Sequence, residues 1–291
     1  MRFKLSFIVL VFVLWSCSAG TLNSPIPARI VIDGLGRSVN LPARIDRAIS
    51  LAPSVTEMIF ASGAGDRLVG VTTYCNFPEE ALNVPKVGDT QTPNIETIIA
   101  LKPQVVFVST DSQLQSFADT LAQQDVAVYV LSVKNFDDVS ANIRQLGSIF
   151  GTEERADAMA DDLQKRVRNV EAHITEPAVR TFIQISREPL FTVGNDSFVT
   201  GVVERAGGIS VTKYVQSAYP KLNKETALAL KPDVIILTDS EDNRTPNDAL
   251  RNSPAVKNGR VYGINADIIS RPGPRLVDAV EQIARFLHGS R

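Results

Sequence analysis

The sequence predicts an α/β protein with two Rossmann-like lobes, each built on a parallel-rich sheet. One long rigid α-helix joins the lobes, and a ligand cleft lies between them. Three observations lead to this fold class. Apolar strand patterns alternate with helical patterns along the chain, which favours parallel sheets covered by helices. A segment of the first half recurs in the second, and between the halves lies a long helical pattern without glycine or proline.

The repeat consists of residues 94–106, NIETIIALKPQVV, and residues 223–235, NKETALALKPDVI. The two segments are offset by 129 positions and share eight of thirteen residues. Each predicts a short helix capped by asparagine with an acid in its first turn, then a Lys-Pro break, then a buried strand. Two related halves leave a cleft between them, and clefts between lobes bind ligands.

In the first half, strand and helix patterns follow each other in regular order. Strands are expected at 29–32, 48–51, 68–72, 105–109 and 126–131, and helices at 53–61, 94–101, 114–124 and 136–150. Ser54 is placed to cap the helix at 53–61, and Gly63 and Gly65 to end it. The continuous apolar run at 105–109 is typical of a strand that is buried on both faces of a parallel sheet.

The second half repeats this order. Strands are expected at 179–185, 234–237 and 261–264, and helices at 197–205, 223–230 and 272–287. Gly207 and Gly208 close the helix at 197–205, and Pro272 stands in the first turn of the last helix, where proline is tolerated.

The segment between the halves, Thr152 to Ile174, follows the 3.6-residue period of a helix. Thr152 is a suitable N-cap and is followed by two acids. Such a helix would be about 34 Å long and would act as a rod rather than a flexible hinge; the alternative is an ordinary surface helix. We therefore expect an N-terminal lobe at residues 29–150, a connecting helix at 151–175 and a C-terminal lobe at 178–291.

The N-terminus predicts export. Arg2 and Lys4 precede an apolar run from Leu5 to Leu14, which is shorter than the roughly 20 residues needed to span a bilayer. Cys17 follows this run and resembles the cysteine that bacteria lipidate at the start of a mature lipoprotein. We expect a lipoprotein-type signal peptide at residues 1–17 and a periplasmic protein anchored through Cys17. Ordinary cleavage near Gly20 is the alternative.

Composition argues against several classes of function. The net charge of −2 gives no basic surface for nucleic acid, and 44% apolar residues indicate a globular core. The chain has no Gly-x-Ser-x-Gly turn and only two histidines, His173 in a charged helical stretch and His288 near the end, so we expect no hydrolase and no enzyme. With Cys17 lipidated, Cys75 is the one remaining thiol, either a buried apolar residue or a cleft residue.

Four stretches resemble a known family: residues 49–57, ISLAPSVTE; residues 69–78, VGVTTYCNFP; the two Leu-Lys-Pro repeats; and residues 270–275, SRPGPR. They are similar to the substrate-binding proteins of bacterial ABC importers whose lobes are joined by one long helix, and the resemblance extends from Arg29 onward. This class binds corrinoids such as cobalamin, ferric siderophores or haem. The resemblance implies that the chain delivers a corrinoid to an inner-membrane permease with its ATPase; a ferric siderophore or haem is the alternative. No cofactor is implied. The chain itself has no Gly-x-x-x-x-Gly-Lys loop, so ATP is used by the partner chains.

The resemblance also implies the ligand residues. Matched to the corrinoid-binding members, they are Tyr74, Thr90, Phe191, Tyr219, Asp267 and Arg271. Aromatic side chains would cover a flat macrocycle and polar groups would fix its edges. Phe191 can instead belong to the core, Tyr219 can anchor a turn, and Arg271 can neutralise Asp267. Those members carry tryptophan where Thr90 and Tyr219 stand here. For haem, Tyr74, Tyr214 or Tyr219 could serve as axial ligand.

In the same family one glutamate on each lobe docks onto arginines of the permease, and Glu96 and Glu225 occupy these positions. The alternative is that each acid only favours the first turn of its helix through the dipole. The disulfide of the corrinoid-binding members has no counterpart, because Ala206 and Ala284 fill its positions. Metal-importer proteins of similar shape use histidine with carboxylates, and because both histidines lie outside the expected cleft loops, we expect no metal site.

Overall fold

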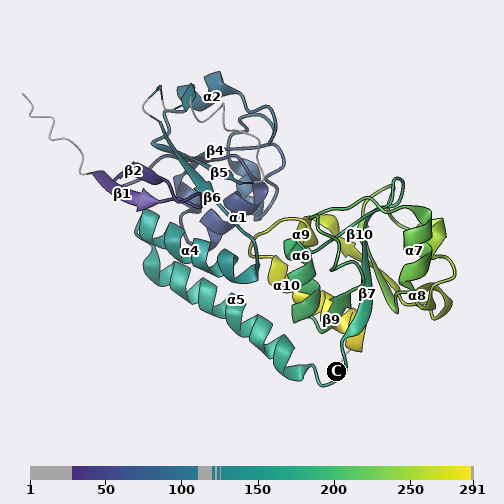
Figure 1. Cartoon of the computed structure of the whole chain (residues 1–291). Helices are drawn as coiled ribbons and strands as arrows, with labels where there is room; N and C mark the ends of the chain where they lie inside the picture. Colours follow the sequence, from purple (N-terminus) through teal and green to yellow (C-terminus); the bar gives the residue numbers. More distant parts are fainter. Residues whose placement is uncertain (1–27, 111–119, 122, 125, 290–291) are drawn as a thin grey trace, which may run out of the picture.

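A computed structural model of the chain describes residues 28–110, 120–121, 123–124 and 126–289. The predicted signal peptide, Cys17 and most of the helix expected at 114–124 lie outside the described residues. In this part of the chain, no helix is both long enough and apolar enough to cross a membrane. Two α/β lobes are arranged side by side, and a single long helix runs beneath both of them (Figure 1).

The first lobe is built on a four-stranded parallel sheet with the order β4-β3-β5-β6. Its strands are β3 (Ala48–Ser50), β4 (Leu68–Val71), β5 (Val105–Ser109) and β6 (Ala127–Leu131). The expected strand at 29–32 is present as β1 (Ala28–Ile32), but it pairs antiparallel with an unexpected β2 (Ser38–Pro42). The reason is a tight turn, in which Asp33 accepts hydrogen bonds from the backbone N–H groups of Leu35 and Arg37 and Gly36 takes φ 76°.

The helices of this lobe fill the connections between strands. They are α1 (Pro53–Ala61), α2 (Ile95–Ala100) and α4 (Phe136–Phe150), with the 3₁₀ turns η1 (Gly65–Arg67) and η2 (Glu79–Asn83). The expectation that Ser54 caps α1 is wrong. Ala52 is the N-cap, Pro53 opens the helix and Ser54 is buried inside it. In α4, Asn135 and Asp138 form a reciprocal capping box.

The repeated segments adopt the same local structure in both lobes. Asn94 caps α2 and Asn223 caps α7 (Lys224–Leu230), each by accepting a hydrogen bond from a threonine N–H three residues on. Each helix ends at a lysine with left-handed backbone, Lys102 at φ 48° and Lys231 at φ 43°. The proline that follows each lysine disfavours the right-handed helical conformation before it. Each repeat then enters a buried strand, which confirms the prediction for both segments.

The helix predicted between the halves is α5 (Glu153–His173). Thr152 is its N-cap residue, but the hydroxyl makes no capping hydrogen bond. Along its first half Arg144 of α4 pairs with Asp157 and Asp161. Further along, Arg166 pairs with Asp278 at 2.7 Å and with Glu281 at 2.8 Å, both on the last helix of the second lobe. The helix is therefore fastened to both lobes.

The second lobe has a five-stranded sheet in which β8-β7-β10-β11 lie in order and β9 also pairs with β7. The strands are β7 (Val179–Ser186), β8 (Phe191–Thr192), β9 (Gly208–Ser210), β10 (Val234–Asp239) and β11 (Val261–Asn265). Only β8 is antiparallel to its neighbour. The strands β8 and β9 were not predicted, because two or three residues are too few to show a period.

Helices cover this second sheet. They are α6 (Phe198–Arg205), α7, α8 (Pro254–Lys257), α9 (Ala266–Ile269) and α10 (Leu276–His288), with the 3₁₀ turn η3 (Asp248–Leu250). The expected start of the last helix at Pro272 is wrong. The unpredicted α9 comes first, the Arg-Pro-Gly-Pro segment forms a turn, and α10 begins at Leu276.

The apolar core is continuous between the lobes. The largest cluster of buried apolar side chains extends from the first sheet, along the inner face of α5, into the second lobe, where it includes Ile183 and Val280. The residues of α5 in this cluster are Ala156, Ala160, Leu163 and Val167. Two smaller clusters, one in each lobe, complete the core.

Candidate functional site

Arg271 stands where the lobes meet. It follows α9 in the second lobe and pairs with Asp267 of α9 at 2.7 Å. Its guanidinium also donates a hydrogen bond of 2.7 Å to Asn76, which lies in the loop after β4 of the first lobe. Asn76 in turn donates to Asp267 at 3.1 Å. These three side chains therefore form a closed polar triangle across the interlobe contact.

A second arginine of the same turn reaches deeper into the first lobe. Arg275 donates two hydrogen bonds to the carboxylate of Glu57 in α1, at 2.6 and 3.0 Å. Its guanidinium also lies 4.4 Å from the centre of the Phe77 ring. Arg271 stands 3.7 Å from the same carboxylate. We call Glu57, Asn76, Asp267, Arg271 and Arg275 the Glu57 cluster.

Glu57 is buried more deeply than its partners. Its side chain is 1% exposed, against 15% for Arg271 and 14% for Arg275. Burial raises the pKa of the Glu57 carboxyl above its usual value, and the hydrogen bonds and charges of Arg275 and Arg271 offset part of this rise. The ionised form of Glu57 therefore depends on the two arginines, because a side chain that is 1% exposed is not solvated by water.

The aromatic and hydroxyl residues predicted on the first lobe share one rim. Tyr74 lies in the turn after β4, two residues before Asn76, and is 57% exposed. Thr90 lies half-buried in a nearby loop, which is tied to the Tyr74 turn because Thr73 N–H donates to Gly88 C=O at 2.9 Å. The carboxylate of Asp89 orders the loop by accepting from the N–H groups of Gln91 and Thr92.

The aromatic residues predicted on the second lobe also lie together. Phe191 is half-buried in β8, and the segment that carries Tyr219 runs antiparallel beside it. The two segments are joined because Thr192 N–H donates to Pro220 C=O and Gly194 N–H donates to Ala218 C=O. Tyr219 is 45% exposed. Among the six predicted residues, Asp267 and Arg271 are in direct contact. The segments that carry Tyr74 and Thr90 are joined by a backbone hydrogen bond, as are those that carry Phe191 and Tyr219.

A hollow between the lobes is lined by other residues than the six predicted ones and the Glu57 cluster. It has a volume of about 390 Å³ and is lined by Lys134 and Asn135 of the first lobe and by the start of α6, Lys213 and Tyr214 of the second. Its volume falls within the range of small-molecule sites, roughly 300–1,000 Å³. Tyr214 is largely exposed, with the Lys213 ammonium 5.4 Å from its ring centre. The hollow offers a ligand an aromatic surface, the two positive charges of Lys134 and Lys213 and the negative charge of Glu204.

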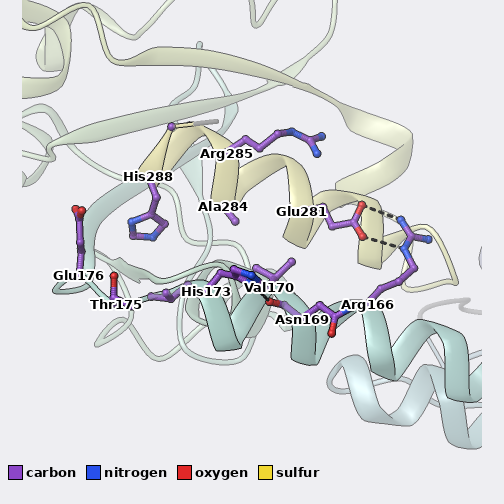
Figure 2. Close-up of a pocket in the computed structure, with 12 residues that line it drawn as sticks. Arg166, Asn169, Val170, His173, Thr175, Glu176, Glu281, Ala284, Arg285 and His288 are labelled. Carbon is purple, nitrogen blue, oxygen red and sulfur yellow. Dashed lines mark hydrogen bonds and ion pairs between the residues drawn. The ribbon is translucent and has the colours of Figure 1, made fainter. Parts of the chain in front are cut away.

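A different hollow of about 470 Å³ lies between the ends of α5 and α10 (Figure 2). The ion pair of Arg166 with Glu281 closes one end, while His288 and His173 stand at the other. Both histidines of the chain therefore line this hollow and not the contact between the lobes. Within the described residues, no three His, Cys, Asp or Glu side chains are grouped so that they could hold a metal ion.

Cys75 is a buried residue and not a cleft-lining one. Its side chain is almost fully covered, and its sulfur lies 3.1 Å from the Thr56 hydroxyl and 3.2 Å from the Thr72 hydroxyl. The thiol supports the turn on which Tyr74 and Asn76 stand.

Glu96 and Glu225 are not part of the Glu57 cluster, and they occupy equivalent positions in the repeated helices of the two lobes. Each is exposed in the first turn of its helix, Glu96 in α2 and Glu225 in α7. The helix α2 lies at the outer end of the first lobe and α7 on the outer side of the second (Figure 1).

The sequence analysis missed Asn76, Glu57 and Arg275 as site residues, although all three lie in the stretches that carry the family resemblance. One signal was available. Glu57 is an acid within the apolar helix pattern of residues 53–61, and buried acids need partners. Nothing in the sequence indicated that the partners come from a segment more than two hundred residues later.

Comparisons with known proteins identify the family of the chain. A family model described as periplasmic binding protein matches residues 49–268. The vitamin B12-binding protein of Vibrio cholerae is 30% identical over 257 residues, covering 84% of this chain and 90% of that protein. An uncharacterized ABC transporter substrate-binding lipoprotein of Bacillus subtilis, YvrC, is 30% identical over 267 residues, covering 88% and 84%.

Solved structures give the same result. The periplasmic vitamin B12 binding protein BtuF of Vibrio cholerae superposes with a TM-score of 0.73 at 31% identity, covering 84% of this chain and 98% of that one. The periplasmic heme binding protein HutB of Vibrio cholerae superposes with a TM-score of 0.76 at 20% identity, covering 83% and 98%. The second likeness shows the fold alone.

Proposed function

The chain belongs to the periplasmic binding protein family, and from this premise we propose that it captures a corrinoid between its lobes and delivers it to an ABC importer. The observation that carries the choice of ligand is the similarity, over most of both chains, to relatives named as vitamin B12-binding proteins. In this role the chain binds and releases its ligand without chemical change.

The site supports a broad, flat ligand. Tyr74 on one lobe and Tyr219 on the other expose rings that a macrocycle can cover, with Phe191 beside Tyr219. Asp267 and Arg271 of the Glu57 cluster would be the polar groups for the edge of the ligand. Large aromatic surfaces with a few fixed polar groups are the usual composition of small-molecule sites. Thr90 stands where the corrinoid-binding relatives are expected to carry tryptophan, so the first-lobe rim would cover less of the ligand.

A binding panel tests the proposal. Purified protein is heated with cobalamin, cobinamide, haem or a ferric siderophore. The true ligand at 100 times its dissociation constant stabilises the folded protein by about 2.7 kcal/mol. We expect this shift with cobalamin and cobinamide. No shift with either corrinoid, but a shift with haem or the siderophore, would reject the corrinoid and retain the transport role.

Haem is a second candidate because of one observation. Tyr214 lines the interlobe hollow and is 80% exposed, so a phenolate at this place could serve as an axial ligand of iron. The Soret band of added haemin separates the two candidates. Under the haem hypothesis, the Tyr214→Phe substitution changes the band, whereas under the corrinoid hypothesis haemin gives no protein-dependent band at all.

The proposal includes export and anchoring. Cys17, outside the described residues, would carry the lipid, and the basic start and short apolar run of the sequence support this. Cys17→Ser should then move the protein from the membrane fraction to the soluble fraction. A wild-type protein that is already soluble and begins after Gly20 would show that the signal is of the ordinary cleaved type.

A further inference from the structure

The lobes are joined by more than α5. The Glu57 cluster connects α1 and the β4 loop of the first lobe to the turn between α9 and α10 of the second. This is a direct contact between segments separated by about two hundred residues, and it carries two positive and two negative side chains. The arrangement raises the question of what the cluster does when a ligand enters or leaves.

The backbone of the second lobe is shaped to approach Glu57 closely. Gly273 is buried, and a Cβ atom added there would stand 3.4 Å from Glu57 Oε2 and 3.5 Å from Ser54 Cα. These are ordinary van der Waals distances, so the Arg-Pro-Gly-Pro-Arg turn packs directly against α1 but does not depend on the glycine for it. The arginines on either side of it then reach the same carboxylate from two directions.

We propose that Glu57 is a positioning residue: it holds Arg275 and Arg271, and thereby fixes both the separation of the lobes and the orientation of the Arg271 guanidinium toward the ligand. The statement about Arg271 rests on the proposed ligand site, whereas the statement about lobe separation does not. Arg275 is the stronger partner, because its fork makes two hydrogen bonds to Glu57. Arg271 is held by three groups at once, from both lobes.

The physical reason is desolvation. If the lobes separate at this contact, Glu57 loses both arginines, and breaking a buried, hydrogen-bonded charge pair is strongly unfavourable. Small rotations that keep the Arg275 fork in place avoid this cost. Another charged contact between the lobes, Arg205 with Asp137, is far more exposed and so holds the lobes weakly. The lobes therefore pivot at Glu57.

A distance measurement on the ligand-free protein tests the first statement. Spin labels are attached at Gln91 and Lys221, which are exposed residues on different lobes, and the distribution of distances between them is recorded. Glu57→Gln keeps the shape of the side chain and removes its charge. We expect a wider distribution with a longer mean distance in this variant, and an unchanged distribution would overturn the proposal.

Two further variants make the result specific. Asp33→Asn removes a buried carboxylate whose arginine partner, Arg37, lies in the same hairpin, so it is a matched control that should leave the distances unchanged. Widening in this control would assign the effect to general loosening and reject the proposal. Should Glu57→Gln fail to fold, Arg275→Lys keeps the charge without the fork, and the same widening is expected there.

Ligand dissociation tests the second statement. With cyanocobalamin as probe, Glu57→Gln should increase the dissociation rate about tenfold or more, while Asp33→Asn leaves it unchanged. Equal rates in both variants would show that Glu57 does not position Arg271. If cyanocobalamin does not bind the wild-type protein, the proposed function fails, and the distance measurement still decides whether Glu57 sets the lobe separation.

Discussion

The two repeated helices allow a sharp test of whether Glu96 and Glu225 dock onto a permease or only support their helices. Each helix carries two residues that act on its first turn in different ways. Asn94 caps α2 by accepting from Thr97 N–H at 2.9 Å, and Asn223 caps α7 by accepting from Thr226 N–H at 2.7 Å. The glutamates stand two residues further on, are exposed, and leave these caps intact when replaced.

The expected magnitudes differ in a useful way. Replacing a capping asparagine with alanine costs about 1 kcal/mol of stability, whereas an exposed acid near a helix N-terminus contributes about 0.3–1 kcal/mol. Asn94→Ala and Asn223→Ala should therefore lower the melting temperature at least as much as Glu96→Ala and Glu225→Ala. If the glutamates meet buried arginines on the partner, losing one leaves a charge unpaired at roughly 2–5 kcal/mol, which is about 30-fold or more in association.

The assay measures two quantities on the same variants: the melting temperature of the purified protein and the uptake of labelled cobalamin by cells that carry the variant gene. Docking predicts slow uptake for each glutamate variant, a severe loss for the double variant, and normal uptake for both asparagine variants. Uptake that instead follows the melting temperature across all four variants would show that the acids serve only their helices. The repeated glutamate would then reflect duplication alone.

The remaining predictions concern the cleft and the effect of pH. Tyr74→Ala should weaken ligand binding without changing the melting temperature, because its ring is mostly exposed; Arg271→Ala should lower both, because Arg271 pairs with Asp267 and Glu57. Calorimetry with and without ligand checks both, and a destabilised Tyr74→Ala protein would make that tyrosine structural. Burial disfavours the Asp33 carboxylate, but hydrogen bonds from Arg37 and Leu35 outweigh this and lower its pKa below the ordinary 3.8. The stability from Asp33 is therefore complete above that value and is lost as the pH falls through the folded-state pKa. Asp33→Asn should reduce the free energy of unfolding by about 1–3 kcal/mol at pH 7 and by much less at pH 2; equal losses in urea titrations at both pH values would contradict this.

Much of the fold could be predicted from local pattern. The continuous apolar run at 105–109 predicts a buried strand, and the 3.6-residue period at 152–174 predicts a helix. Both elements occur within one residue of the expected bounds. The predictions that were wrong concern positions whose structure depends on contacts with residues distant in the sequence. Ser54 looked like a cap, but Pro53 opens α1 one residue earlier and Ser54 is buried. Pro272 looked like the first turn of the last helix, but the chain turns there instead, so that Arg271 and Arg275 can both reach Glu57.

The candidate site shows the same division. The family resemblance, and not a local pattern, pointed to Tyr74, Asp267 and Arg271. The contacts of Asn76 and Glu57 could not be predicted from the sequence, because their partners, Arg271 and Arg275, reach them only when one lobe packs against the other. Long-range pairing of this kind leaves no periodic trace in a single sequence.

The positions of the charged contacts along α5 limit how the lobes can move. The buried Ala156, Ala160, Leu163 and Val167 pack α5 into the core that both lobes share. Arg144 pairs with Asp157 and Asp161 on the side of the first lobe, and Arg166 pairs with α10 of the second. The hydrogen bonds that Arg166 donates to Glu281 and Asp278 raise its pKa, so this fastening keeps its charge at any physiological pH. The helix is thus packed against both lobes, and a rotation of the lobes must be absorbed by bending it. A helix resists such bending except at small angles. The Glu57 cluster also allows only small rotations of the lobes, because larger ones would break the two hydrogen bonds from Arg275 to Glu57. The packed helix and the buried ion cluster therefore favour the same small range of motion, and wide separation of the lobes would require breaking the hydrogen bonds of the Glu57 cluster.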